Sequence, residues 1–192
     1  SPLFDGAGVQ NGALLTQRYL MTNTGATTVD FELVRYLDGD LLFDGTLIDG
    51  GGRLITPSGT EVLFETDAGG GGSTATTFVG ITGTGGTIPA VNRFEIDSYS
   101  GLETRIANGT ALDGLITGDA NADGFVDLGS EYDVTLGLRN LFSLAPGASD
   151  TYTTLTVFGT GAPNQLDFGA GGSVFNDLDG NGIKDPGETP LP

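Results

Sequence analysis

The chain has 192 residues, which suits one large all-β domain or two small ones and suffices to bury a hydrophobic core. It has no histidine and no cysteine, so the composition excludes Ser-His-Asp and Cys-His catalysis, structural zinc, haem, iron–sulfur ligation and disulfide bonds. With 25 Asp and Glu against 7 Lys and Arg, the net charge of -18 disfavours nucleic acid and anionic lipid and favours cations as partners.

The pattern of the chain is that of strands. Apolar residues alternate with threonine and charged residues, and Gly, Asn and Asp interrupt them at short intervals, which predicts an all-β protein. A first antiparallel pair is expected at 13–22 and 28–37 around a turn at 23–25, with Val29, Phe31 and Leu33 on one face. Shorter strands are expected at 41–43, 61–65, 76–82, 93–97 and 112–117.

The second half of the chain contains two further hairpin signals. Asn108-Gly109 predicts a type I′ turn between 104–106 and 111–112. The clearest strand starts at Tyr132 and keeps its parity to Leu144, and a Thr-rich strand at 151–158 is predicted to pair with it as a hairpin. About nine strands in this length predict a two-sheet sandwich or a barrel. The fold expected here is a two-sheet antiparallel β-sandwich, Ig-like or jelly-roll-like, and the calcium loops described below are part of that expectation.

Two glycine clusters divide the chain. Residues 69–72 are interpreted as a surface loop and residues 169–172 as a linker. The predicted organisation is therefore a β-sandwich domain at 1–168 and, at 169–192, a Gly linker with a short calcium-loop tail.

The strongest local motif lies in that tail, at residues 177–188. Counted from Asp177, it fills every position of the twelve-residue calcium loop, with Gly182 at the sharp turn and Glu188 as the bidentate ligand. Its carboxylates repel one another unless a cation lies among them, and the alternative is an acidic, Gly-rich turn. The predicted ligands are Asp177, Asp179, Asn181, Ile183 through its carbonyl, Asp185 and Glu188.

A second loop begins at Asp119 and fills the same positions except the last. Position 12 is Ser130 and Glu131 falls one place late, so calcium binding should be weaker, and a solvated turn is the alternative. The predicted ligands are Asp119, Asn121, Asp123, Phe125 through its carbonyl, Asp127 and Glu131. Strand patterns and not helices flank both loops, so Ca²⁺ is expected to stabilise the fold and not to switch it.

A third acidic stretch lies between residues 38 and 49. Its carboxylates are interpreted either as solvated turn residues or as a poorer third cation site. They are Asp38, Asp40, Asp44 and Asp49.

The loops resemble those of known families. Residues 118–127, which begin Gly-Asp-Ala-Asn-Ala-Asp-Gly, resemble the calcium loop of dockerin repeats, but a strand pattern replaces the dockerin helix, so cohesin binding is not implied. Residues 172–191 resemble the start of the B-type calcium modules of serine-aspartate-rich bacterial surface proteins, where a strand ending in Val-Phe leads into the acidic loop. The remainder is similar to secreted bacterial β-sandwich surface proteins.

These features predict a secreted, extracellular or cell-surface protein and no enzyme. The chain begins at Ser1 without an initiator Met, as expected after removal of a signal peptide, and no apolar run is long enough for membrane insertion. We expect a calcium-stabilised structural or adhesive protein that self-associates into a filament or matrix, or binds other surface proteins, by strand addition. The N-terminal residues 1–10 and C-terminal residues 189–192 are the candidate donor strands.

Two other functions stay open. One is a calcium-dependent carbohydrate-binding module, in which Tyr19, Tyr36 and Tyr99 would line the glycan site, although the chain has no Trp. The other is a carboxylate-based glycoside hydrolase, which needs only two acidic residues.

Overall fold

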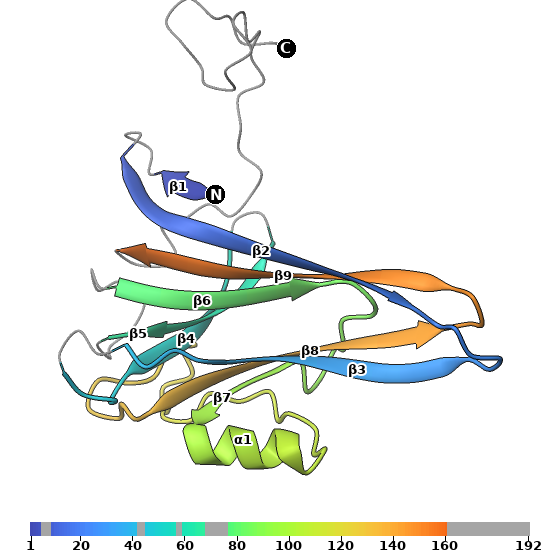
Figure 1. Ribbon diagram of the computed structural model, residues 1–192. Coiled ribbons are helices and arrows are strands. Elements are labelled where there is room, and N and C mark those ends of the chain that lie inside the picture. The colour runs from blue at the N-terminus through green and yellow to red at the C-terminus, as the bar shows by residue number, and fades with distance from the viewer. Residues whose placement is uncertain (5–8, 42–44, 57–58, 68–76, 161–192) are drawn as a thin grey trace, which may run out of the picture.

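The computed structural model describes residues 1–4, 9–41, 45–56, 59–67 and 77–160. In these residues it shows two packed antiparallel sheets and one helix, which confirms the all-β sandwich (Figure 1). The strands are β1 (Pro2–Phe4), β2 (Gln10–Thr22), β3 (Val29–Asp38), β4 (Gly50–Ile55), β5 (Glu61–Thr66), β6 (Thr77–Thr84), β7 (Phe94–Ser98), β8 (Val134–Leu144) and β9 (Ser149–Thr160), and the helix is α1 (Tyr99–Ala107).

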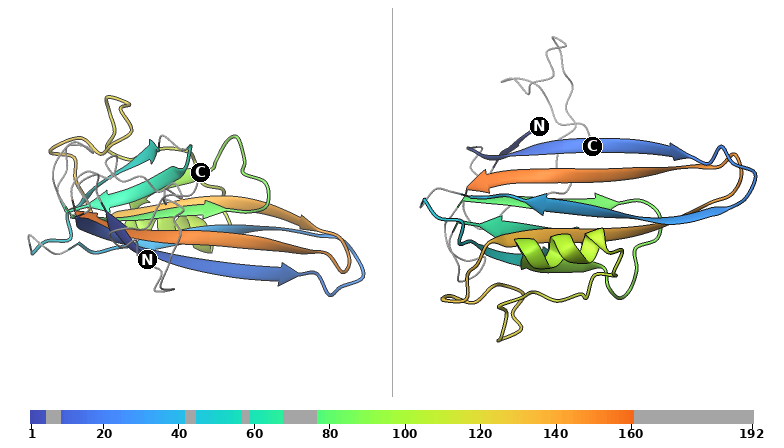
Figure 2. Two further views of the ribbon diagram at one scale, coloured as in Figure 1. Left: turned by 90° about the horizontal axis from the view of Figure 1, so that it is seen from above. Right: turned by 60° about the horizontal axis from the view of Figure 1, so that its bottom comes forward.

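The two sheets differ in size. The six-stranded sheet has the order β1-β2-β9-β6-β5-β4, and the three-stranded sheet has the order β3-β8-β7. Helix α1 packs on the outer face of the small sheet, where Leu102 is buried against Gly137 (Figure 2). Because the small sheet packs on β5 and β6, the large sheet extends beyond it on the β1 and β2 side.

Alternating apolar residues of both sheets, together with Val126 from the segment between α1 and β8, form the main core. Each of the following is 0% or 1% exposed, and they pack together between the sheets: Leu63, Ile81, Ile96, Val126, Val134, Leu136 and Leu138. A second cluster, on the opposite face of the large sheet, consists of Phe64, Phe78 and Val157 with Leu14, Leu54 and Phe125 packed against it. The period-2 alternation in the sequence thus places both faces of the central strands in apolar surroundings.

Both predicted hairpins of long strands are wrong in their pairing. The strands exist near the expected positions, but β2 pairs with β9 in the large sheet, while β3 pairs with β8 in the small one. The chain therefore crosses between the sheets at 23–28 and again at 145–148. A short turn and alternation identify two successive strands, but they do not decide whether the second strand pairs with the first or packs over it.

The two crossings lie side by side and are held together by Asn23 (Figure 1). Its backbone N–H donates to the carbonyl of Ala148 at 2.9 Å, and its carbonyl accepts from Gly147 N–H at 2.9 Å. Its side-chain amide donates to the carbonyls of Leu144, at 2.7 Å, and Thr27, at 2.8 Å. This buried asparagine fixes both connections in one arrangement.

The predicted hairpin at 104–112 is wrong, because residues 99–107 form α1. Ser98 caps the helix by accepting a hydrogen bond from Gly101 N–H at 3.3 Å, and Leu102 provides its buried side chain. Asn108 and Gly109, with φ +63° at the glycine, end the helix instead of turning a hairpin. Their sequence suits both roles.

The shorter predictions have mixed outcomes. Strands near 61–65, 76–82 and 93–97 are confirmed as β5, β6 and β7, whereas 112–117 contributes only an isolated bridge from Ile116 to Ile96. Neither β4, which starts with three glycines, nor β1 is among the predicted strands. Residues 42–43 of the predicted strand at 41–43 and the Gly cluster at 69–72 lie outside the described residues, as does the whole tail at 169–192.

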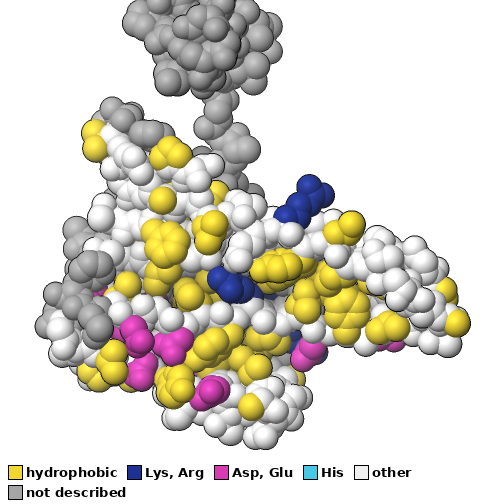
Figure 3. All heavy atoms as spheres, viewed as in Figure 1, with side chains coloured by type: hydrophobic (Ala, Val, Ile, Leu, Met, Phe, Trp, Pro, Cys, Tyr) yellow, Lys and Arg dark blue, Asp and Glu magenta, His cyan; other side chains and the backbone are white. Residues whose placement is uncertain are grey.

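A groove remains open where the large sheet extends beyond β3. It has a volume of about 340 Å³ and is lined by Tyr19, Met21, Leu33, Val34, Arg35, Tyr152 and Thr154. Figure 3 shows hydrophobic side chains along the opening between the sheets, and acidic side chains gathered at the left end of the same face. β3 is an edge strand beside this groove.

Candidate metal centre

The loop at 119–127 is attached to the edge of the large sheet. Val126 N–H donates to the carbonyl of Gly51 at 2.8 Å, and Arg53 N–H donates to the carbonyl of Gly124 at 2.9 Å. Val126 is 1% exposed in the main core, and the Phe125 ring packs on Phe64 with centroids 5.7 Å apart. The loop is therefore anchored by its sixth, seventh and eighth residues.

A glycine in β4 makes this close approach possible. A Cβ on Gly52 would lie 2.6 Å from the Phe125 ring and 2.8 Å from the carbonyl oxygen of Gly124. No other residue type fits there without displacing the loop.

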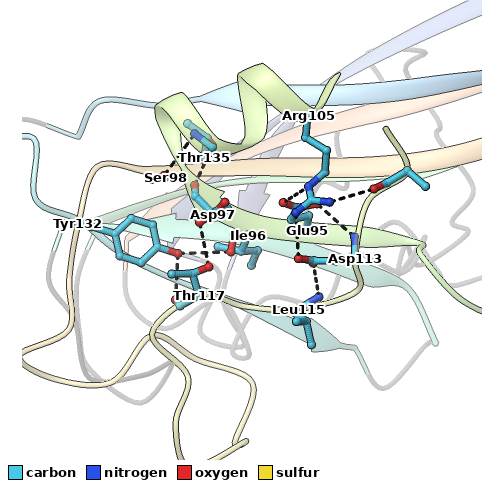
Figure 4. A network of polar contacts seen from close by, with 12 residues as sticks. Glu95, Ile96, Asp97, Ser98, Arg105, Asp113, Leu115, Thr117, Tyr132 and Thr135 are labelled. Carbon is cyan, nitrogen blue, oxygen red and sulfur yellow. Dashed lines mark hydrogen bonds and ion pairs between the residues drawn. The ribbon is translucent and has the colours of Figure 1, made fainter. Parts of the chain in front are cut away.

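The segment that leads into the loop is held on the small sheet (Figure 4). The buried Glu95 accepts from Arg105 Nε at 2.7 Å and from Asp113 N–H at 3.1 Å. Burial and the nearby Asp113 raise the pKa of Glu95, while the Arg105 guanidinium lowers it. Further along, Tyr132 donates its hydroxyl hydrogen to the carbonyl of Thr117 at 2.9 Å, so both ends of the loop are fixed.

Within the loop, the first three predicted ligands fold back on the loop's own backbone. The carboxylate of Asp119 accepts from Asp123 N–H at 3.1 Å and from Gly124 N–H at 3.0 Å. Asn121 accepts from Asp123 N–H at 2.9 Å, and Asp123 accepts from Phe125 N–H at 3.1 Å. Gly124 has φ +93°, the sharp turn expected at the sixth position.

The last predicted ligands of this loop are engaged elsewhere. Asp127 accepts from Ala120 N–H at 2.9 Å, which closes the loop, whereas Glu131 accepts from Gly129 N–H at 2.8 Å, within its own turn. Among the described residues, the carboxylates of 119–127 do not bring three ligand oxygens close enough together to share a metal ion. Another group of acidic side chains does.

That group consists of Asp38, Asp40 and Asp133, whose ligand oxygens all lie within 4.8 Å of one another. Asp38 ends β3, Asp40 follows it, and Asp133 precedes β8, so the β3–β8 pairing brings them together. From sequence, Asp38 and Asp40 were considered together with Asp44 and Asp49 as a third cation site. Asp44 lies outside the described residues, and Asp49 is 1% exposed and bridged to Tyr132. Asp133 was missed because nothing local indicates which strand pairs with β3.

Negative charge on Asp38 and Glu65 is disfavoured, because both carboxylates are near other acidic side chains and are partly or fully buried. Burial, and then the neighbouring Asp40 and Asp133, raise the pKa of Asp38. Glu65, which is 0% exposed, has its pKa raised from 4.5 to about 9, first by burial and then by Asp49 and Asp38. A bound cation would relieve the same repulsion.

The tail loop at 177–188 lies outside the described residues, so its predicted ligands stay a prediction. They are Asp177, Asp179, Asn181, Ile183, Asp185 and Glu188.

Of the tyrosines considered for a glycan site, Tyr19 and Tyr36 do not share one face. Tyr19 is 46% exposed and stacks on Tyr152 at 6.2 Å between centroids, beside the groove. Arg35 reaches across to Thr156, so its neighbour Tyr36 points to the opposite face of β3.

Comparison with protein-family models and with curated proteins finds no match to this chain. In the part of the chain that the structure describes, no helix is long and apolar enough to cross a membrane.

Proposed function

We propose that this protein is a calcium-stabilised structural or adhesive protein of the cell exterior, which self-associates through its open strand edge. The observation that carries the calcium part is the attachment of the 119–127 loop to β4 through Gly51, Arg53 and the buried Val126. An ion held by this loop would be coupled to the large sheet through these contacts. Ion binding would then add directly to the stability of the sandwich.

The loop chemistry suits the high calcium concentration outside cells. It presents oxygen ligands from Asp119, Asn121 and Asp123, but Glu131 is bound to its own turn and supplies no bidentate carboxylate in this arrangement. Calcium loops with few charged ligands bind in the range of roughly 0.1–1 mM that is found in extracellular modules.

The calcium part is tested by thermal unfolding of the full chain with calcium and with a chelator. We expect calcium to raise the melting temperature of the wild type, and the increase to shrink in Asp119→Ala/Asp123→Ala. Glu103→Gln removes one charge from an exposed position of α1 and should behave like the wild type. An undiminished calcium effect in the loop variant would refute the assignment.

Self-association is supported by the edges of the small sheet. The described strands contain no lysine, a residue that commonly protects sheet edges, and β3 lies beside an apolar groove. A strand added to β3 would cover the part of the large sheet that the small sheet leaves open. The N-terminal donor is partly used within the chain, because β1 pairs with β2.

The assembly part is tested by sedimentation of the full chain with calcium. Val29, the first residue of β3, is 44% exposed, so Val29→Lys should keep the fold but reduce association at this edge. Leu128→Lys, at an 81% exposed position in a loop, is the matched control. Assembly that is equal in both variants would exclude the β3 edge, and a monomeric wild type at high concentration would exclude self-association.

A further inference from the structure

Two unpaired strand edges lie on the same side of the sandwich. β3 pairs only with β8, and β1 together with Ser1 covers the edge of β2 only as far as Leu14. On this side, residues 15–22 of β2 and the whole of β3 therefore have no neighbouring strand in the described chain. β2 lies one strand further out than β3, because Arg35 of β3 reaches Thr156 of β9, and β9 is the inner neighbour of β2.

This stepped outline is complementary to itself. A twofold axis that runs along the strands, between the two layers, brings the large sheet of a second copy into the layer of the small sheet. β2 of each copy then lies beside β3 of the other, so two ladders form at once. Pairing of β3 with β3 of a second copy in one layer is excluded, because the two projecting β2 strands would occupy the same space.

Contacts within one chain show which residues of the two strands lie level with each other. Leu15 is level with Arg35, because Arg35 Nη2 donates to Oγ1 of Thr156, the ladder partner of Leu15, at 3.0 Å. Tyr19 is level with Phe31, because the ladder partners of these two residues contact each other edge to edge, with ring centroids 6.1 Å apart. The strands therefore run in opposite directions. Since rotation about an axis along the strands keeps these levels, the ladder between copies is antiparallel and has the same register.

This register places complementary side chains opposite each other. Leu14 packs in the cluster outside the large sheet and Arg35 points between the sheets, so even-numbered residues of both strands face outward and odd-numbered residues face inward. The cross-strand pairs are Leu15–Arg35, Thr16–Val34, Gln17–Leu33, Arg18–Glu32, Tyr19–Phe31, Leu20–Asp30 and Met21–Val29. They include an ion pair, an aromatic pair and an apolar pair, and no like charges face each other. Such pairs each contribute about 0.2–1 kcal/mol.

The side chains in this ladder differ from the rest of the acidic surface. Every exposed large apolar side chain that the structure describes on β2 and β3 belongs to it, namely Leu15, Tyr19, Leu20 and Val29. Arg18 takes part in none of the ion pairs among the described residues, and β2 contains no acidic residue. Figure 3 shows basic side chains beside the hydrophobic ones along this opening. In a chain of net charge -18, copies repel each other least at an edge whose single charge is positive.

We propose that two copies of this chain form an interlocked dimer, in which residues 15–21 of each β2 pair with residues 29–35 of the other copy's β3. The two sandwiches then share one continuous core, and the groove beside Tyr19 is filled by β2 of the second copy. This inference rests on the self-association proposed above and names the surface that meets the β3 edge. Ser1 and β1 end the ladder, because they occupy the edge of β2 from Leu14 to its start, so residues 36–38 of β3 stay outside it.

Disulfide trapping in the full chain tests the ladder, because the chain has no cysteine of its own. Arg18 and Glu32 lie on the two opposite outer faces of one sandwich, whereas across the ladder their Cβ atoms would be about 4.5–5.5 Å apart. We expect Arg18→Cys/Glu32→Cys to oxidise to a covalent dimer on a non-reducing gel. The control Arg18→Cys/Glu103→Cys removes the same charges, with Glu103 exposed on α1, and should stay uncross-linked. A wild type that sediments as a dimer, without this cross-link in the variant, overturns the ladder and leaves self-association standing.

Charge exchange gives a second measurement that general damage to the fold would not imitate. Arg18→Glu or Glu32→Arg alone places like charges opposite each other in both ladders and should weaken dimerisation at least about fivefold in sedimentation equilibrium. The combined variant restores opposite charges and should dimerise more tightly than either single variant. Additive weakening in the combined variant overturns the pairing. A wild type that stays monomeric at high concentration overturns both this inference and the self-association proposed above.

Discussion

Replacing Asn23 by alanine should measure how strongly the two crossings between the sheets depend on one side chain. Asn23 is 7% exposed, donates two hydrogen bonds through its side-chain amide and accepts one from Gly25 N–H at 2.9 Å. The alanine variant loses all three. It also leaves the carbonyl of Leu144, which lies in a buried hydrogen bond, without its donor.

The magnitude follows from these contacts. Each hydrogen bond contributes about 1 kcal/mol net, and a buried acceptor left unsatisfied costs about 1–3 kcal/mol. We therefore expect Asn23→Ala to lower the free energy of unfolding by about 3 kcal/mol. In a domain of this size the melting temperature should fall by about 6–12 °C.

Urea unfolding of the wild type and the variant in chelator is the suitable assay, because it excludes calcium effects. Thr24→Ala changes an exposed neighbour in the same turn and should stay within about 0.5 kcal/mol of the wild type. A loss below about 1 kcal/mol in Asn23→Ala, with an unchanged urea dependence, would show that the crossings are held by other contacts.

Three further changes test other parts of the structure. Because the pKa of Glu65 is raised above its unfolded value of 4.5 to about 9, stability in chelator should be complete below about pH 4.5 and fall by about 1.4 kcal/mol per pH unit up to about pH 9. Glu65→Gln should remove this dependence, and parallel stability curves for the two proteins would contradict the interpretation. Gly52→Ala should lower unfolding free energy by more than about 2 kcal/mol and weaken calcium binding by the adjoining loop, as its Cβ would overlap Phe125; an unchanged melting temperature would contradict the contact. Arg93→Met, measured by urea unfolding, should cost about 3–5 kcal/mol because it removes the ion pair with Glu61 at 2.9 Å and the hydrogen bond to Asn140 at 2.7 Å, and a loss below about 1 kcal/mol would show that these contacts are dispensable.

Local sequence predicted those strands in which buried apolar residues alternate with polar residues along the chain. The clearest case is β8, whose residues Val134, Leu136 and Leu138 are fully buried as their parity indicates. Strand β4 escaped prediction because its three leading glycines, of which Gly52 allows the 119–127 loop to pack closely, look like a turn in sequence. Helix α1 escaped because its short apolar pattern and the Asn108-Gly109 pair also suit a hairpin.

The candidate sites divide in the same way. The 119–127 loop could be identified from sequence, because its ligand positions and its glycine lie within a few residues and the loop geometry is local. The group of Asp38, Asp40 and Asp133 could not, because Asp133 is more than ninety positions from the other two and meets them only through the β3–β8 ladder.

The sequence by itself determined that the chain is mostly strand, that its class is a sandwich and where its acidic motifs lie, since these depend on patterns of residues that are neighbours along the chain. Only the tertiary structure decided that β2 and β9, and separately β3 and β8, form ladders, because strand partners are selected by the burial of both sheet faces and by buried polar groups such as Asn23. That selection also brought the buried Glu65 against the turn at Gly39.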